Sequence, residues 1–154
     1  MTKVENLVYK LKVNNYTITT AESCTGGMIA STIIDVPGTS QVVKEFHVTY
    51  SNEAKMKYLG VDRETIDTYS EVSKETVTAM VMGAAKLADA DVAIAVTGLA
   101  GPTGGTEDKP VGLVYIACMV KDKIKIDSPI FSGDRYQIRK SATEHAIDMA
   151  LEML

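Results

Sequence analysis

The sequence predicts an α/β fold, a three-layer α/β/α sandwich around a mixed, mostly parallel sheet of about five strands. Three observations support this prediction. Segments with apolar residues at helical spacing alternate with short strand-like segments, an order typical of parallel strands joined through helices. Residues 92–96 are wholly apolar, as in a strand buried on both faces. Late in the chain, Lys121-Asp122-Lys123 alone separates two strand-like segments, which predicts an antiparallel hairpin and one antiparallel strand.

In the first half of the chain, helices and strands are expected to alternate. Apolar residues at helical spacing predict a helix over 2–13, and Asn14-Asn15 ends it. Alternating apolar and hydroxyl side chains predict a strand over 16–20, and β-branched and aromatic residues predict a second over 42–50. The helices that follow these strands are expected at residues 27–34 and 52–59.

The second half is expected to hold two long helices and three strands. Residues 61–72 predict a turn, a short helix and a loop, and Ser73 opens a longer helix with one apolar face. The buried strand over 92–96 leads into a glycine-rich loop. The remaining elements are two hairpin strands over 111–120 and 124–131, and a terminal helix from about residue 133.

Length and composition limit the classes of protein to which the chain can belong. Its 154 residues fit one domain, expected to span residues 1–154, and its net charge of −4 argues against nucleic acid or an anionic membrane as partner. No apolar run reaches the roughly 18 residues of a membrane-spanning helix, so we expect a cytoplasmic protein. The two cysteines, Cys24 and Cys118, form no disulfide framework, and no Cys or His pair has zinc-ligand spacing.

The segment Ala-Glu-Ser-Cys-Thr-Gly-Gly, residues 21–27, lies where an extended segment gives way to a helix. Backbone N–H groups at a helix start lack partners, so a nucleophile beside them could attack a carbonyl and have its oxyanion stabilised. Ser23 is the candidate nucleophile. Cys24 is a rival, because a helix N-terminus lowers a thiol pKa, but no histidine base is expected beside it. The alternative is an ordinary serine or threonine N-cap.

Residues 22–27, 50–55 and 97–105 each follow the end of a predicted strand. If these strands are parallel, the three segments converge on one edge of the sheet, where ligands bind in α/β folds. Lys55 lies near a helix start, which disfavours its charge, so it could act as a general base; the alternative is a solvated surface lysine. Tyr50 could relay a proton, or it could cover the core.

Two further features could bind an anion. The glycine-rich loop, including Gly98 and Gly101, would let a backbone approach a phosphate, although it matches no nucleotide-cofactor motif and could be a flexible connection. Arg135 and Arg139 are four residues apart and so share a helix face, where they could clamp a phosphate or form surface ion pairs. Nothing in the sequence favours a catalytic triad that includes His47 or His145.

Six motifs together give the chain a family resemblance. They are Ala-Glu-Ser-Cys-Thr-Gly-Gly (21–27), Asp-Val-Pro-Gly (35–38), Val-Thr-Tyr-Ser-Asn-Glu-Ala-Lys (48–55), Val-Thr-Gly-Leu-Ala-Gly-Pro (96–102), Gly-Gly-Thr-x-x-Lys-Pro-Val-Gly (104–112) and Phe-Ser-Gly-Asp-Arg (131–135). In this order, from about residue 5 to the end, the chain resembles the CinA carboxyl-terminal domain family, which includes stand-alone members of the PncC type.

The resemblance implies a three-layer sandwich and a nicotinamide mononucleotide amidohydrolase (deamidase) that serves pyridine nucleotide salvage and NAD metabolism. Nicotinic acid mononucleotide and ammonia would be its products. It implies Ser23 as nucleophile, Lys55 as base, Tyr50 as an aid to proton transfer, and no metal or other cofactor. We also expect a homodimer. The alternative is a non-catalytic nucleotide-binding or competence/damage-related interaction module. The residues expected to bind substrate are Cys24, Thr25, Gly26, Gly27, Thr97, Gly98, Gly101, Arg135 and Arg139.

Overall fold

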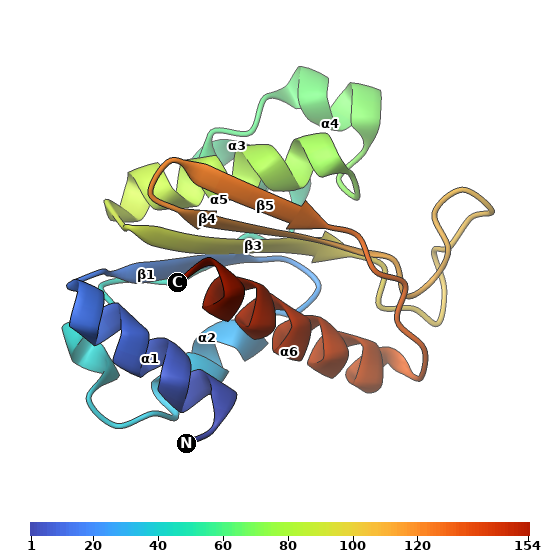
Figure 1. Ribbon diagram of the computed structural model, residues 1–154. Coiled ribbons are helices and arrows are strands. Elements are labelled where there is room, and N and C mark those ends of the chain that lie inside the picture. Colours follow the sequence, from blue (N-terminus) through green and yellow to red (C-terminus); the bar gives the residue numbers. More distant parts are fainter.

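A computed structural model describes all residues, 1–154, and contains one five-stranded sheet with the order β2-β1-β3-β4-β5 (Figure 1). The strands are β1 (Ile18–Glu22), β2 (His47–Val48), β3 (Val92–Gly98), β4 (Val114–Val120) and β5 (Lys123–Asp127). β1 pairs in parallel with β2 and β3, whereas β4 is antiparallel to both β3 and β5. The mixed sheet with one antiparallel strand and a late hairpin is therefore confirmed.

Helices cover both faces of this sheet, as the sandwich prediction requires (Figure 1). One layer contains α1 (Lys3–Asn14), α2 (Met28–Ile34) and α6 (Arg135–Met153), and the other contains α3 (Asn52–Leu59), α4 (Arg63–Tyr69) and α5 (Lys74–Ala88). α5 packs on β1, β3 and β4, while α6 packs on β3 and β4 from the opposite side. The order of helices and strands matches the sequence prediction, with one 3₁₀ turn added at Thr39–Gln41.

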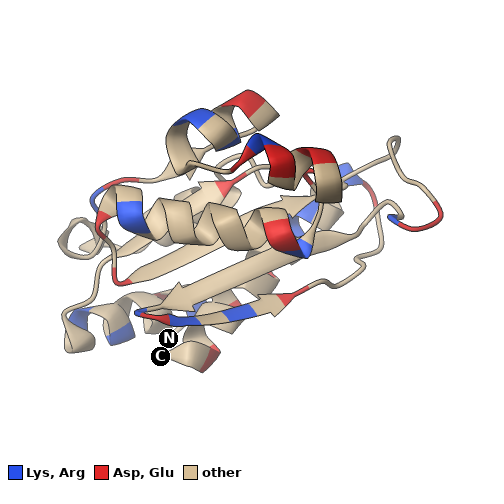
Figure 2. Ribbon diagram, turned by 90° about the horizontal axis from the view of Figure 1, so that it is seen from above, with Lys and Arg blue, Asp and Glu red and all other residues tan.

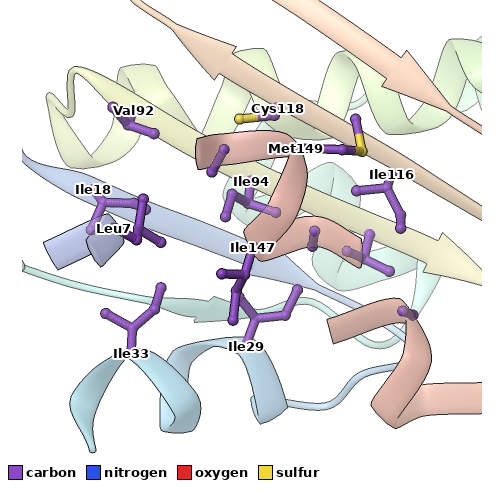
Figure 3. Packing of buried hydrophobic residues seen from close by; sticks show 14 of the residues in the cluster. Leu7, Ile18, Ile29, Ile33, Val92, Ile94, Ile116, Cys118, Ile147 and Met149 are labelled. Carbon is purple, nitrogen blue, oxygen red and sulfur yellow. The ribbon is translucent and has the colours of Figure 1, made fainter. Parts of the chain in front are cut away.

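The central strand β3 divides the apolar interior into two cores. Val92, Ile94 and Val96 face the larger core, which lies under α1, α2 and α6 (Figure 3). Ala93 and Ala95 face the smaller core under α5. All five residues are fully buried, so the prediction of a strand covered on both faces is confirmed. The alternation of large and small side chains gives α5 a flat surface on which to pack closely.

The strand predicted over 42–50 is the main error in the sequence-based assignment. Its regular pairing covers His47–Val48 alone, with one isolated bridge between Val43 and Ile18. β2 lies at the edge of the sheet and pairs on one side only, so β-branched composition does not suffice to extend it. The strand predicted over 16–20 runs instead through Glu22, because residues as far as Glu22 pair with β3.

Charged residues lie on the helices, the loops, the edge strand β5 and, as Glu22, the end of β1, whereas β3 and β4 carry none (Figure 2). Positive and negative segments are interspersed in this view, which fits the modest net charge of −4. No helix is both long enough and apolar enough to span a membrane.

Candidate active site

The carboxyl ends of β1, β2 and β3 open into one cleft with a volume of about 480 Å³, in the range of small-molecule sites. The three parallel strands bring together the segments that follow them, as expected for an α/β sheet. Eight of the predicted site residues line this cleft: Ser23, Cys24, Tyr50, Lys55, Thr97, Gly98, Gly101 and Arg135. Four do not: Thr25, Gly26, Gly27 and Arg139.

Ser23 and Lys55 form the centre of the cleft. Lys55 Nζ lies 3.2 Å from Ser23 Oγ and 3.2 Å from the carbonyl oxygen of Tyr50. Ser23 follows β1, whereas Lys55 is carried by α3, whose start is fixed by the Ser51 hydroxyl accepting a hydrogen bond from the Ala54 amide. Both reactive side chains are buried, Lys55 with 1% of its surface exposed and Ser23 with 8%. A hydroxyl and an amine are thus held in hydrogen-bonding contact away from bulk water.

The Ser23 hydroxyl does not cap a helix. Its hydrogen-bond partners are Lys55 Nζ and the Tyr50 carbonyl, and no backbone amide donates to it. The N-cap of α2 is Gly27, which has no side chain to accept a bond. The alternative interpretation of Ser23 as an ordinary N-cap is therefore wrong, because the turn after β1 delays the helix by four residues.

Burial lowers the pKa of Lys55, and the negative charge of Glu71 opposes this shift in part. Desolvation penalises an ammonium that has neutral partners, Ser23 Oγ and the Tyr50 carbonyl, and no salt bridge. The sequence analysis predicted a lowered pKa from the helix start, but the main cause is burial. A larger fraction of neutral amine makes Lys55 a better acceptor for the serine proton.

Cys24 has the opposite electrostatics from those expected. Burial raises the pKa of its thiol to about 11, despite the opposing charge of Arg139 and the adjacent backbone amide. The expectation that a helix start would favour the thiolate is wrong, because desolvation of the buried thiol outweighs the effect of its own backbone amide. Cys24 is therefore a weak rival to Ser23 as nucleophile.

Glu22 provides the cap that α2 lacks. Its carboxylate is fully buried and accepts hydrogen bonds from the backbone amides of Gly27 (3.2 Å), Ile29 (2.9 Å) and Ala30 (2.9 Å). Of the N–H groups near residues 24–27 that were expected to hold a substrate oxyanion, Glu22 therefore occupies that of Gly27. The negative side chain also complements the helix dipole.

Two amides in the preceding turn remain free. The turn is closed by a hydrogen bond from the Gly26 amide to the Ser23 carbonyl, 3.0 Å long. Neither the Cys24 amide nor the Thr25 amide donates to any backbone or side-chain acceptor of the chain. The amide of the residue after a serine nucleophile is a common oxyanion donor, and Cys24 lines the cleft whereas Thr25 does not, so the Cys24 N–H is the candidate for that role.

Replacement of Glu22 by glutamine is expected to lower the free energy of unfolding by about 2–4 kcal/mol. Glutamine offers one acceptor oxygen in place of two, so its NH₂ group would face a buried backbone donor. Urea unfolding followed by circular dichroism measures the loss. Glu5→Gln, in the exposed capping box of α1, is the matched control and should cost less than about 1 kcal/mol. Equal losses for both variants would contradict this assignment.

Tyr50 contributes its carbonyl to the Ser23–Lys55 pair, whereas its phenol points elsewhere. Arg135 Nη2 donates to Tyr50 Oη over 3.2 Å, and Arg135 Nη1 donates to the carbonyl of Gly101 over 2.6 Å. Arg135 thereby joins the second and third segments across the cleft mouth. The phenol, 3.2 Å from a guanidinium, is placed to contact a ligand beside Arg135 and has no hydrogen bond to Lys55.

The other predicted residues occupy supporting positions. Thr97 donates its hydroxyl proton to the Glu71 carbonyl and so fixes the α4–α5 loop against β3. Arg139 Nε and Nη2 donate to the carbonyls of Cys24 (2.9 Å) and Thr25 (3.0 Å), on the turn and outside the cleft. The two histidines pair with surface carboxylates, so neither serves Ser23. No cluster of three or more potential metal ligands is present.

Sequence reasoning missed several residues that build or line the site. Glu22 was quoted within a motif without a role, although an acidic residue just before a glycine-led helix could have been tested as its cap. Glu71 and Val72 line the cleft from the loop between α4 and α5. Their segment carries no motif, and hydrophobic patterning contains no signal that would place it against the other three.

A family model for the CinA C-terminal domain matches residues 1–154. This chain belongs to the CinA C-terminal domain family. It is 49% identical over 148 residues to a CinA-like protein of Fervidobacterium nodosum and 47% identical over 150 residues to one of Kosmotoga olearia. These matches cover 96% and 97% of the chain but 36% of each relative, so this CinA domain spans little more than a third of their length.

Crystal structures of family members have the same fold. The competence damage-inducible protein A of Klebsiella pneumoniae superposes with a TM-score of 0.94 at 35% identity, covering 97% of this chain and 93% of that one. The competence/damage inducible protein CihA of Agrobacterium tumefaciens gives a TM-score of 0.90 at 37% identity, covering 99% and 97%. The α/β architecture of this CinA domain is thus that of its solved relatives.

Proposed function

We propose that this CinA domain is a serine amidohydrolase that converts nicotinamide mononucleotide to nicotinic acid mononucleotide and ammonia. The observation that supports this most is the 3.2 Å contact between Lys55 Nζ and Ser23 Oγ inside a cleft. A buried hydroxyl beside an amine of lowered pKa fits covalent catalysis, in which the amine removes the hydroxyl proton. The choice of nicotinamide mononucleotide as the substrate rests on the resemblance of the motifs to PncC-type members of the family.

In the first half of the proposed reaction, Ser23 Oγ attacks the carboxamide carbon while neutral Lys55 accepts the hydroxyl proton. The carbonyl oxygen becomes an oxyanion, and the free amide of Cys24 is its candidate donor. The carbon–nitrogen bond then breaks, and the Lys55 ammonium gives its proton to the leaving nitrogen, which departs as ammonia. An ester between the Ser23 oxygen and the nicotinoyl group of the mononucleotide remains, with the ribose phosphate still attached.

In the second half, water attacks the ester carbon while neutral Lys55 accepts a proton from it. The ester bond breaks, the proton returns to Ser23 Oγ, and nicotinic acid mononucleotide leaves. The sum of both halves is amide plus water giving acid plus ammonia. The Tyr50 carbonyl accepts a hydrogen bond from Lys55 throughout, which keeps the amine directed at Ser23.

The direct test is ammonia release from nicotinamide mononucleotide by the purified protein, with product identified by mass spectrometry. Nicotinamide, nicotinamide riboside and unrelated primary amides serve as comparison substrates. Turnover of the mononucleotide, and weaker turnover of the others, would support the proposal. Saturable binding without product after long incubation would contradict it and favour the nucleotide-binding module. The expected homodimer stays a prediction, for which light scattering is the measurement.

Arg135 is expected to bind the substrate phosphate, because its guanidinium lies at the cleft mouth and forms no salt bridge with a carboxylate. Arg135→Gln should raise KM for nicotinamide mononucleotide about 10-fold or more and change kcat much less. Nicotinamide riboside, which lacks the phosphate, is the control: its kcat/KM should hardly change. Equal losses for both substrates would contradict a phosphate role.

A further inference from the structure

Arg139 lies outside the cleft, yet its side chain on α6 forms two hydrogen bonds to the turn that follows Ser23. Its Nε donates to the carbonyl of Cys24 and its Nη2 donates to the carbonyl of Thr25. No carboxylate lies within salt-bridge distance of it. The two charge-assisted hydrogen bonds of Arg139 therefore both go to carbonyls of consecutive peptide groups in one turn.

Each of these contacts leads to a free amide. The Cys24 carbonyl shares its planar trans peptide group with the Thr25 N–H, so the bond from Arg139 directs this N–H away from α6. The Thr25 carbonyl shares a peptide group with the Gly26 N–H, which donates to the Ser23 carbonyl. That carbonyl in turn shares a peptide group with the free Cys24 N–H.

Hydrogen bonds in series polarise one another, so a cation at the carbonyl end of a chain strengthens the donor at the other end. The Cys24 amide, the candidate oxyanion donor, is the free end of such a chain, and this chain begins at Arg139 Nη2. The dipole of α2 cannot supply this effect, because Glu22 already accepts from its first amides. The positive polarisation of the turn thus comes from a side chain contributed by the last helix.

Gly26 makes room for this arrangement. Its φ is +59°, which favours glycine, and a Cβ there would lie 3.3 Å from Arg139 Nη2. A larger residue at 26 would therefore strain the turn and crowd the guanidinium at once. The glycine is explained by the contact with Arg139, and it does not line the cleft.

We propose that Arg139 is a positioning residue whose guanidinium, acting through the peptide groups of the turn, orients and polarises the Cys24 amide as an oxyanion donor of Ser23. The inference rests on the proposed serine mechanism. It replaces the expected phosphate-binding role of Arg139 with one that acts through the backbone. Arg135 and Arg139, although one turn apart on α6, then serve different ends of the reaction, substrate binding and transition-state stabilisation.

The test is steady-state kinetics of Arg139→Ala and Arg139→Lys with nicotinamide mononucleotide. Arg139→Ala should lower kcat about 10- to 100-fold and leave KM within about twofold, because oxyanion donors act on the transition state. Lysine keeps the charge but not the two-nitrogen fork, so Arg139→Lys should retain intermediate activity. Millimolar guanidinium should restore part of the kcat of Arg139→Ala. Arg63→Ala, an exposed arginine of α4, is the control and should show neither effect.

A purely structural role for Arg139 would give a different result. The urea midpoint of Arg139→Ala would fall, while kcat per folded molecule would stay within about twofold of the wild type and guanidinium would not raise it. This outcome would overturn the inference.

Labelling of Ser23 by a small fluorophosphonate, followed by mass spectrometry, separates this inference from the choice of substrate. The phosphoryl oxygen of the probe would occupy the same donor, so Arg139→Ala should react at least about 10-fold more slowly than the wild type. If the wild type releases no ammonia but is labelled in this Arg139-dependent way, the proposed substrate fails and the inference stands. Equal labelling rates would overturn the inference alone. A wild type that neither turns over nor reacts would overturn both.

Discussion

Ser23→Ala should lower kcat/KM for nicotinamide mononucleotide about 10⁴-fold or more, since removal of a serine nucleophile abolishes the covalent route. The fold should persist, because Lys55 keeps its hydrogen bond to the Tyr50 carbonyl and the substitution removes only the hydroxyl oxygen. Ammonia release should be measured over several decades of enzyme concentration, so that a 10⁴-fold lower kcat/KM can still be detected. Urea unfolding checks that the variant has a free energy of unfolding close to that of the wild type.

Cys24→Ala is the matched control for this variant. The neighbouring thiol is buried and its pKa is raised to about 11, so its removal should change kcat/KM by no more than roughly threefold. Mass spectrometry of enzyme quenched during turnover should find the nicotinoyl group, with its ribose phosphate still attached, on the peptide that contains Ser23. Full activity of Ser23→Ala together with inactive Cys24→Ala would refute the serine mechanism and make the thiol the nucleophile.

Lys55→Met is expected to lower kcat/KM about 10²- to 10⁴-fold, the usual contribution of a general base, and to stabilise the protein. Burial lowers the pKa of Lys55, which means that the folded state resists the charge that the unfolded state carries freely. A buried methionine removes this penalty, so the free energy of unfolding at pH 7 should rise by about 1 kcal/mol. Lys57→Met, an exposed position on the same helix, should change neither property appreciably.

The pH dependence follows from the same shift. Since the folded pKa lies below the ordinary value of 10.5, the unfolded chain binds more protons between these two values, and stability should rise with pH across that interval. The kcat/KM of the wild type should also rise with pH and level off below 10.5, as neutral Lys55 accumulates. A flat profile, or a Lys55→Met variant that is both active and less stable, would count against Lys55 as the base.

Much of the fold was predictable because it depends on local patterns. The spacing of apolar residues in α1 and α5 and the unbroken apolar run of β3 each correspond to one backbone geometry. The edge strand β2 was not predictable in extent, since its length depends on how far β1 offers it partners. Residues 42–50 have the composition of a strand, but composition does not supply hydrogen-bond acceptors.

The candidate site divides in the same way. The three motifs that follow the parallel strands could be placed at one edge of the sheet from their positions alone. The sequence could not show whether Ser23 caps a helix or contacts Lys55, since a hydroxyl followed by glycines suits both roles. Arg135 and Arg139 likewise look equivalent in sequence. In the structure, Arg135 lines the cleft mouth and donates to the Gly101 carbonyl, whereas Arg139 donates to the Cys24 carbonyl in the turn after Ser23.

By itself, the sequence determined the fold class, the order of helices and strands, and the three segments that meet at the cleft. Those properties follow from side-chain periodicity and from the parallel pairing that helical connections impose. The tertiary structure alone decided that Glu22 satisfies the start of α2, that burial sets the pKa of Lys55, and that the free amides belong to Cys24 and Thr25. All three findings depend on which groups from distant segments are packed together away from water. No local sequence pattern encodes that packing.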